Sequence, residues 1–94
     1  MKKIVINKCF GGFGLSKKAL GRFNELCEDK DKTHYAGNIN REHLSLIKVV
    51  EELGDEANSW HSKLSIVAIP DDVNYQIDEY DGREHIAETH RTWR

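Results

Sequence analysis

The stretch KKIVINKCFGGFGLSKKALGRFNELC, residues 2–27, decides the fold. It begins with the β-branched run Ile4–Ile6, which has no polar break and therefore predicts a strand covered on both faces. Three glycines follow within four residues and supply the backbone freedom that a turn needs. Ser16 is a good N-cap for a helix that runs to Cys27 with apolar residues at helical spacing. The stretch therefore predicts a strand, a glycine turn and a helix.

The charges of this stretch are one-sided, because residues 1–24 hold six basic side chains and no acid. Lys17 and Lys18 fall in the first helical turn, where the helix dipole favours carboxylates. A cation there costs about 0.3–1 kcal/mol, and a bound anion would remove that cost. The pattern predicts an anion site at the turn; the alternative is that the lysines are solvated and the glycines only make a tight connection. The run GGxG matches neither the dinucleotide fingerprint nor the phosphate-binding P-loop.

The composition limits the class of protein. Ninety-four residues, 38% of them apolar and 32% charged, predict one folded domain over residues 1–94. No apolar run reaches the length of a membrane span and no signal peptide is visible, so we expect a cytoplasmic protein with no membrane partner. Two cysteines are too few for a disulfide framework. The net charge of −2 divides into +6 for residues 1–24 and −8 for the rest, which argues against non-specific binding of nucleic acid.

The middle of the chain predicts structural elements. Residues 28–40 are polar and alternate in charge, as is typical of a loop, and Asn40 is a fair N-cap for a helix over 41–53. Gly54 would end that helix. Trp60 is expected to cover an edge of the core, and a second apolar strand is predicted over residues 63–69, before a proline.

The C-terminal part predicts a hairpin. Apolar and polar residues alternate over 73–80, and Asp81-Gly82 is a strong two-residue turn signal before a return strand over 83–91. The alternative is a short helix, because Asp81 followed by Glu84 also resembles an N-cap pair. The hairpin gives the order β-α-α-β-β-β, which predicts a single small α+β domain. We expect two helices on one face of a mixed or antiparallel sheet of three to five strands, with the strands at residues 4–6 and 63–69 in its centre; a right-handed crossover is expected if those two are parallel.

Catalytic and metal sites are not predicted. The five histidines lack the spacing of metal ligands, and Ser16, which follows the glycines, lacks a nucleophile elbow. The acids of residues 71–88 are scattered along a half-exposed hairpin, where carboxylates are typically solvated. We therefore expect no enzyme, no metal and no cofactor.

The C-terminal residues His90–Arg94 form a second notable cluster, HRTWR. Arginine binds phosphate bidentately and tryptophan offers a stacking surface for a base. The alternative is a final strand with one tryptophan in the core and two solvated arginines.

Several segments of the chain carry a resemblance to a known family. They are VINKCFGGFGLS (5–16), VVEELG (49–54), IPDDV (69–73), IDEYDG (77–82) and E.IAE.HRTW (84–93). Through them the chain resembles a family of small, largely uncharacterised proteins encoded by bacteriophages and prophages. The resemblance implies a phage gene product that works inside a bacterial host cell, and it carries over no catalytic or binding residues. By analogy with other small accessory phage proteins, it suggests an anti-defence factor.

These observations predict a non-enzymatic protein that sequesters an anionic, nucleotide-like signalling molecule, as a homo-oligomer. The alternative is an inhibitor that covers a host defence protein with its acidic hairpin, residues 71–88; a third possibility is an enzyme that acts on a nucleotide. The residues expected to bind the small ligand are Lys8, Gly11, Gly12, Phe13, Gly14, Ser16, Lys17, Lys18, Tyr80, His90, Arg91 and Trp93.

Overall fold

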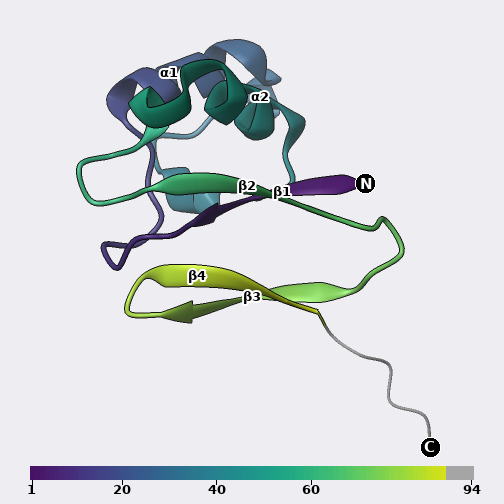
Figure 1. The fold of residues 1–94 in the computed structure, drawn as a ribbon. Coiled ribbons are helices and arrows are strands. Elements are labelled where there is room, and N and C mark those ends of the chain that lie inside the picture. The colour runs from purple at the N-terminus through teal and green to yellow at the C-terminus, as the bar shows by residue number, and fades with distance from the viewer. Residues whose placement is uncertain (89–94) are drawn as a thin grey trace, which may run out of the picture.

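The order of helices and strands is β-α-α-β-β-β in the computed structural model, which describes residues 1–88 (Figure 1). The chain forms a small α+β domain, as the sequence predicts. Its elements are β1 (Lys2–Asn7), α1 (Lys17–Leu26), α2 (Leu44–Leu53), β2 (Leu64–Ile69), β3 (Tyr75–Tyr80) and β4 (Arg83–Glu88), with short 3₁₀ turns at Asp29–Asp31, Ala36–Asn38 and Gly54–Ala57.

The strands of residues 1–88 form two antiparallel pairs instead of one continuous sheet. β1 pairs with β2, and β3 pairs with β4. Figure 1 shows the helices on one side of the β1–β2 pair and the β3–β4 hairpin on the other, so the two apolar strands do form the central layer. A third strand does not join β1, because the backbone of Val5 and Asn7 on its outer edge is bonded to Arg41 and Glu84.

The central position of β1 gives the molecule two apolar clusters. Val5 packs into the cluster beneath the helices, whereas Ile4 and Ile6 pack with Ile69 toward the hairpin. Residues 4–7 are all buried, as predicted for a strand covered on both faces. Successive side chains of a strand point to opposite faces, so β1 packs against the helices on one face and against the hairpin on the other.

Helix α1 begins where the sequence predicts. The Ser16 hydroxyl accepts a hydrogen bond from the amide of Ala19 at 3.1 Å, and Cys27 ends the helix. Ala19 and Phe23 are buried in the cluster shared with α2.

Helix α2 begins at Leu44, so the predicted start at residue 41 is wrong by three residues. The Asn40 side chain accepts from the amide of Glu42 at 2.8 Å, which closes a separate turn instead of opening the helix. His43 then caps the helix, because its Nδ1 accepts from the amide of Ser45 at 3.1 Å. The helix ends at Gly54 with φ of 57°, as predicted.

The C-terminal hairpin is confirmed, and the alternative helix is wrong. Asp81 and Gly82 have φ of 52° and 91°, and they form a two-residue turn that sets Tyr80 opposite Arg83. β4 continues to Glu88; the last three residues of the predicted return strand, 89–91, lie outside the described residues.

Trp60 does not cover the core, because 95% of its surface is exposed. The loop that carries it is closed by polar groups: the hydroxyl of Ser62 accepts from the amide of Ser59 at 2.9 Å and donates to the carbonyl of Gly14 at 2.8 Å. This leaves Trp60 at the tip of the turn, where its ring packs edge-on against His61.

Candidate ligand-binding site

A pocket of about 500 Å³ lies where the loop after β1 meets the turn end of the β3–β4 hairpin. Its volume falls in the range of small-molecule sites, roughly 300–1,000 Å³. We call it the hairpin pocket. Its lining residues are Lys8, Phe10, Tyr80, Arg83, Glu84 and His85.

Two accessible aromatic rings belong to this pocket. Phe10 is 59% exposed and Tyr80 is 72% exposed. The Arg83 guanidinium carbon lies 5.8 Å from the centre of the Phe10 ring, within reach of a cation–π interaction. Flat aromatic and guanidinium faces of this kind are suited to stacking against a base.

The charge of the hairpin pocket is predominantly positive. Within residues 1–88, neither Lys8 nor Arg83 lies within ion-pair distance of a carboxylate. His85 has Asp78 as a neighbour, with 3.7 Å between Nε2 and Oδ2. Two cations are therefore left to face a ligand.

The one acid of the pocket is already neutralised by the protein. Glu84 is only 6% exposed, and its two carboxylate oxygens accept from Nη1 and Nη2 of Arg41 at 2.5 and 2.9 Å. The Arg41 guanidinium in turn lies over the ring of Phe13, 3.6 Å from its centre. Such a bidentate, charge-assisted pair holds both side chains in one geometry, so Glu84 does not oppose an anion in the pocket.

Asn7 joins the segments that form the pocket. Its buried side chain accepts from the amide of Lys63 at 2.8 Å and donates to the carbonyl of Gly82 at 2.7 Å and of Cys9 at 2.6 Å. Its own amide donates to Glu84 at 2.8 Å. One side chain therefore ties the loop after β1 to the start of β2 and to the hairpin turn.

The glycines allow these loops to approach closely. A Cβ on Gly82 would clash with the carbonyl oxygen of Phe10, and one on Gly11 would clash with that of His61. Gly12 has φ of 97°, which suits glycine. The amides of Gly11, Gly12 and Gly14 donate to no acceptor within the described part of the chain, so their role in binding phosphate stays a prediction.

The lysines of the first helical turn lie apart from the hairpin pocket. Lys18 pairs with Glu56 at 2.6 Å, and this hydrogen bond, followed by the charge of the ammonium, holds the pKa of Glu56 below its usual value. The Ser16 hydroxyl donates to the carbonyl of Glu56 at 2.7 Å, while Lys17 is exposed. The protein's own acid therefore offsets part of the unfavourable charge at the helix start.

Other basic residues of the N-terminal segment also have partners. Lys3 pairs with Glu51 at 2.7 Å and Arg22 pairs with Glu52 at 3.0 Å. The acids of α2 and the turn after it thus neutralise half of the six basic side chains. The hydrogen bond to Glu52 is the largest of the interactions that raise the pKa of Arg22.

The structure therefore brings together only some of the predicted ligand-binding residues. Lys8 and Tyr80 share the hairpin pocket, whereas Phe13 does not line it but packs under Arg41, the partner of Glu84. The predicted residues His90, Arg91 and Trp93 lie outside the described residues.

Four residues of the pocket are not among the predicted ligand-binding residues: Phe10, Arg83, Glu84 and His85. The hairpin register contained a signal for Arg83, because a two-residue turn at 81–82 sets it opposite Tyr80. No local pattern indicated Phe10 or the burial of Glu84, since both depend on contacts between distant segments.

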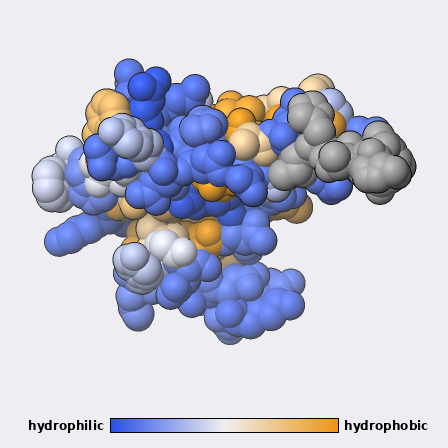
Figure 2. Space-filling view, turned by 90° about the horizontal axis from the view of Figure 1, so that it is seen from below, coloured by the Kyte–Doolittle hydropathy of each residue, from blue (hydrophilic) through white to orange (hydrophobic). Residues whose placement is uncertain are grey.

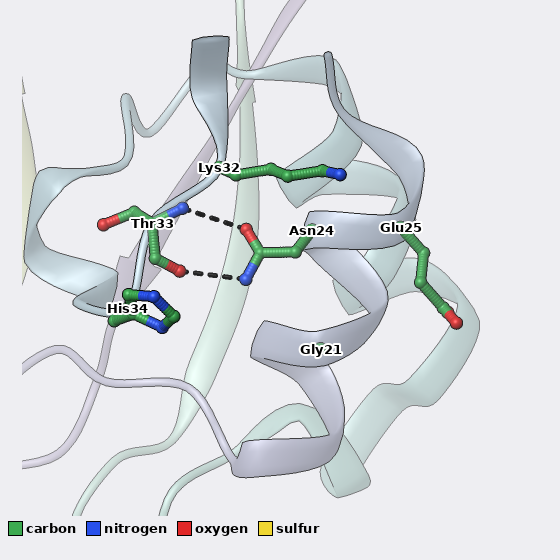
Figure 3. A pocket seen from close by; sticks show the side chains of 6 residues that line it. All are labelled: Gly21, Asn24, Glu25, Lys32, Thr33 and His34. Carbon is green, nitrogen blue, oxygen red and sulfur yellow. Dashed lines mark hydrogen bonds between the residues drawn. The ribbon is translucent and has the colours of Figure 1, made fainter. Parts of the chain in front are cut away.

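A second pocket, of about 430 Å³, lies between α1 and the segment that follows it (Figure 3). Asn24 extends from α1 and pairs its amide group with the backbone of Thr33, at 2.9 and 3.0 Å. Lys32 pairs with Asp29 and Glu25 with Arg22. The Asn24 amide is thus used to hold the loop to the helix, and the Lys32 ammonium already has a carboxylate partner, so this pocket is less suited to an anion.

The surface around the hairpin is mostly hydrophilic. Figure 2, seen from the hairpin side, shows the hydrophobic residues in separate small patches on this surface. Within residues 1–88, no helix is long and apolar enough to span a bilayer, and no three His, Cys, Asp or Glu side chains are grouped as metal ligands would be.

No protein-family model, no curated protein and no solved structure matches the chain. The function is therefore inferred from the geometry of the hairpin pocket.

Proposed function

We propose that the protein is a non-enzymatic binding protein that sequesters an anionic, nucleotide-like small molecule in the hairpin pocket. Lys8 and Arg83 would bind phosphate, while Phe10 and Tyr80 would stack against the base. The glycine turn and Lys17, which the sequence predicts to bind phosphate, remain a second possible contact surface for the same ligand.

One observation supports this proposal above the others. Two cations without an ionic partner in residues 1–88 and two accessible aromatic rings line a pocket of about 500 Å³, while its carboxylate is held by Arg41. Charge-assisted contacts to phosphate and stacking on a base are the two interactions that nucleotide recognition needs.

The biological setting of the proposal comes from the resemblance to phage proteins. A phage protein that removes a nucleotide signal would act as an anti-defence factor in the cytoplasm of the bacterial host. A homo-oligomer would offer several such pockets per assembly.

The test is isothermal titration of the full chain against cyclic mononucleotides, cyclic dinucleotides and ADP-ribose derivatives. We expect one class to bind, and inorganic phosphate alone to bind more weakly because it cannot stack. Lys8→Glu and Arg83→Glu should each weaken that binding about tenfold or more, since a charge-assisted hydrogen bond contributes about 1.5–3 kcal/mol.

Two matched charge reversals locate the site. Lys30→Glu changes the net charge equally on an exposed lysine outside the pocket, and it should leave the affinity within about twofold. Lys17→Glu tests the helix turn; if it abolishes binding while Lys8→Glu does not, the ligand belongs there and not in the hairpin pocket. Silence across the whole panel would refute the proposal.

The second candidate function is inhibition of a host protein through the acidic hairpin. It is favoured by the exposure of several of its acids, namely Asp71, Asp72, Glu79, Asp81 and Glu88. Glu84 is not part of that surface, because it is buried against Arg41. Reversing Asp72, Glu79 and Glu88 to lysine should abolish inhibition of a host protein's activity and leave nucleotide binding intact.

A further inference from the structure

We infer that the outer edge of β2 is a pairing surface for a second copy of this chain, with a two-fold axis at Val67. The two copies of β2 would run antiparallel and join the two β1–β2 pairs into one four-stranded sheet. This inference does not depend on what the hairpin pocket binds.

The register of β1 and β2 shows which backbone groups point outward. The amide of Lys8 donates to the carbonyl of Lys63 at 2.7 Å, and these residues extend the register that sets Lys2 opposite Ile69. Directly opposed residues in an antiparallel pair alternate between bonded and non-bonded. Residues 63, 65, 67 and 69 of β2 therefore bond toward β1, whereas residues 64, 66 and 68 direct their backbone groups away from it.

The outer edge of β1 is occupied. The amide of Val5 donates to the carbonyl of Arg41 at 2.9 Å, and the carbonyl of Val5 accepts from the Arg41 side chain at 3.4 Å. The amide of Asn7 donates to Glu84. These bonds also confirm the outward direction of odd-numbered residues on this strand.

The outer edge of β2 is open over a short window. At one end the amide of Leu64 donates to the side chain of Asn58 at 2.7 Å, and at the other end Pro70 has no amide hydrogen. Between them, the outward amides and carbonyls of Ile66 and Ala68 have no hydrogen-bond partner within residues 1–88.

This window is complementary to itself. A two-fold axis at Val67 sets Ile66 opposite the partner's Ala68 and Ala68 opposite the partner's Ile66. Each bonded pair exchanges two hydrogen bonds, so all four donors and acceptors of the window are used. An interface in which residue i meets j and j meets i is the geometry of two-fold dimers.

The side chains and charges favour the same arrangement. β2 reads LSIVAI and has no charged residue, whereas exposed edge strands are usually protected by charges or proline. The same axis brings Lys63, which precedes the strand, to the turn that begins with the partner's Asp71. Lys63 and Asp71 are both exposed, and Asp71 also lies 3.4 Å from the N-terminal ammonium of Met1, so each end of the paired strands would set Lys63 beside a carboxylate that it shares with that ammonium.

The experiment measures the mass of the full chain by sedimentation equilibrium over a series of concentrations. We expect twice the 10.8 kDa of one chain. Ala68→Pro removes an outward amide without touching the bonds to β1, so it should weaken the dimer roughly tenfold or more. Ala68→Thr keeps the amide and should remain dimeric.

Cross-linking tests the register independently of how Ala68→Pro folds. In a non-bonded pair at the axis the two Val67 Cα atoms would lie about 4.5 Å apart, within disulfide range, so oxidised Val67→Cys should form a covalent dimer. The two Ser65 residues would be about 13 Å apart, so Ser65→Cys should cross-link no more than the wild type, which retains Cys9 and Cys27.

Three outcomes would overturn the inference. They are a wild-type chain that is monomeric at every concentration, a folded Ala68→Pro protein that stays dimeric, and Ser65→Cys that cross-links as readily as Val67→Cys. The last two would assign self-association to another surface.

Discussion

Glu84 affects both the packing of the hairpin and the charge of the hairpin pocket. Its carboxylate bonds to the Arg41 side chain and to the backbone of Asn7, so it fastens β4 to β1. The same bonds turn its charge away from the hairpin pocket. A single side chain therefore affects both the packing of the hairpin and the electrostatics of the candidate site.

Removing this carboxylate should strongly destabilise the fold. Glu84→Ala leaves the guanidinium of Arg41 without its partner, and breaking a buried ion pair costs about 3–5 kcal/mol. The free energy of unfolding, measured by urea titration, should fall by that amount.

The matched control is Glu79→Ala, at the residue opposite Glu84 on the neighbouring strand. Glu79 is exposed, so its loss should change the free energy of unfolding by no more than about 0.5 kcal/mol. Equal effects of the two substitutions would show that the Arg41–Glu84 pair does not hold the hairpin.

Tyr75 should make stability depend on alkaline pH. Burial first, and then its hydrogen bond to the Glu42 carboxylate, raises the pKa of Tyr75 from 10.0 to about 12. The folded state therefore keeps this proton at pH values where the unfolded chain loses it. The resulting stability is complete below pH 10 and is lost as the pH rises from about 10 to 12.

The measurement compares urea unfolding of the wild type and Tyr75→Phe across that pH range. Lysines titrate there in both proteins, so the difference between the two is the quantity of interest. It should shrink as the pH rises, and Glu42→Gln should reduce the dependence. A difference that stays constant from about pH 9 to pH 12 would exclude this role for Tyr75.

Among the elements, the turn of the β3–β4 hairpin has little tolerance for a side chain at Gly82. Gly82 has φ of 91°, and a Cβ there would meet the backbone of Phe10 and Gly12. Gly82→Ala combines a strained conformation with a backbone clash, so we expect a loss of about 2 kcal/mol or more in the free energy of unfolding.

Substitution of a second glycine, Gly21, should have the opposite effect on the free energy of unfolding. Gly21 lies inside α1, and no neighbouring segment comes within 4 Å of the position that a Cβ would take there. Gly21→Ala should therefore stabilise the protein by about 0.5–1 kcal/mol. Thermal unfolding of the two variants should move in opposite directions. A harmless Gly82→Ala would contradict the close packing of the hairpin turn against the loop after β1.

At the scale of the whole molecule, the sequence predicts what local chemistry determines. The buried run Ile4–Ile6, the cap at Ser16, the helix end at Gly54 and the Asp81-Gly82 turn are each set by a few neighbouring residues, and each is confirmed. The prediction that Trp60 covers an edge of the core is wrong: Ser62 bonds the loop that carries it to Gly14, and the ring is exposed.

The separation into layers was not predictable, because it depends on contacts between distant segments. The bonds of Val5 to Arg41 and of Asn7 to Glu84 close the outer edge of β1, and no pattern of neighbours indicates either contact. The candidate site shares this limit. Lys8 and Tyr80 were identified for their chemistry, but their meeting with Phe10 depends on the hairpin packing against the central strands.

The bond between Arg41 and Glu84 also orders events during synthesis. The two residues are separated by 43 positions, so during synthesis the Arg41 guanidinium lies without this counter-charge until β4 has been translated. A ribosome that stops before residue 84 would release a polypeptide that contains both helices but lacks the carboxylate that pairs with Arg41. We therefore expect a fragment that lacks β4 to be degraded faster in a cell than a chain that contains it.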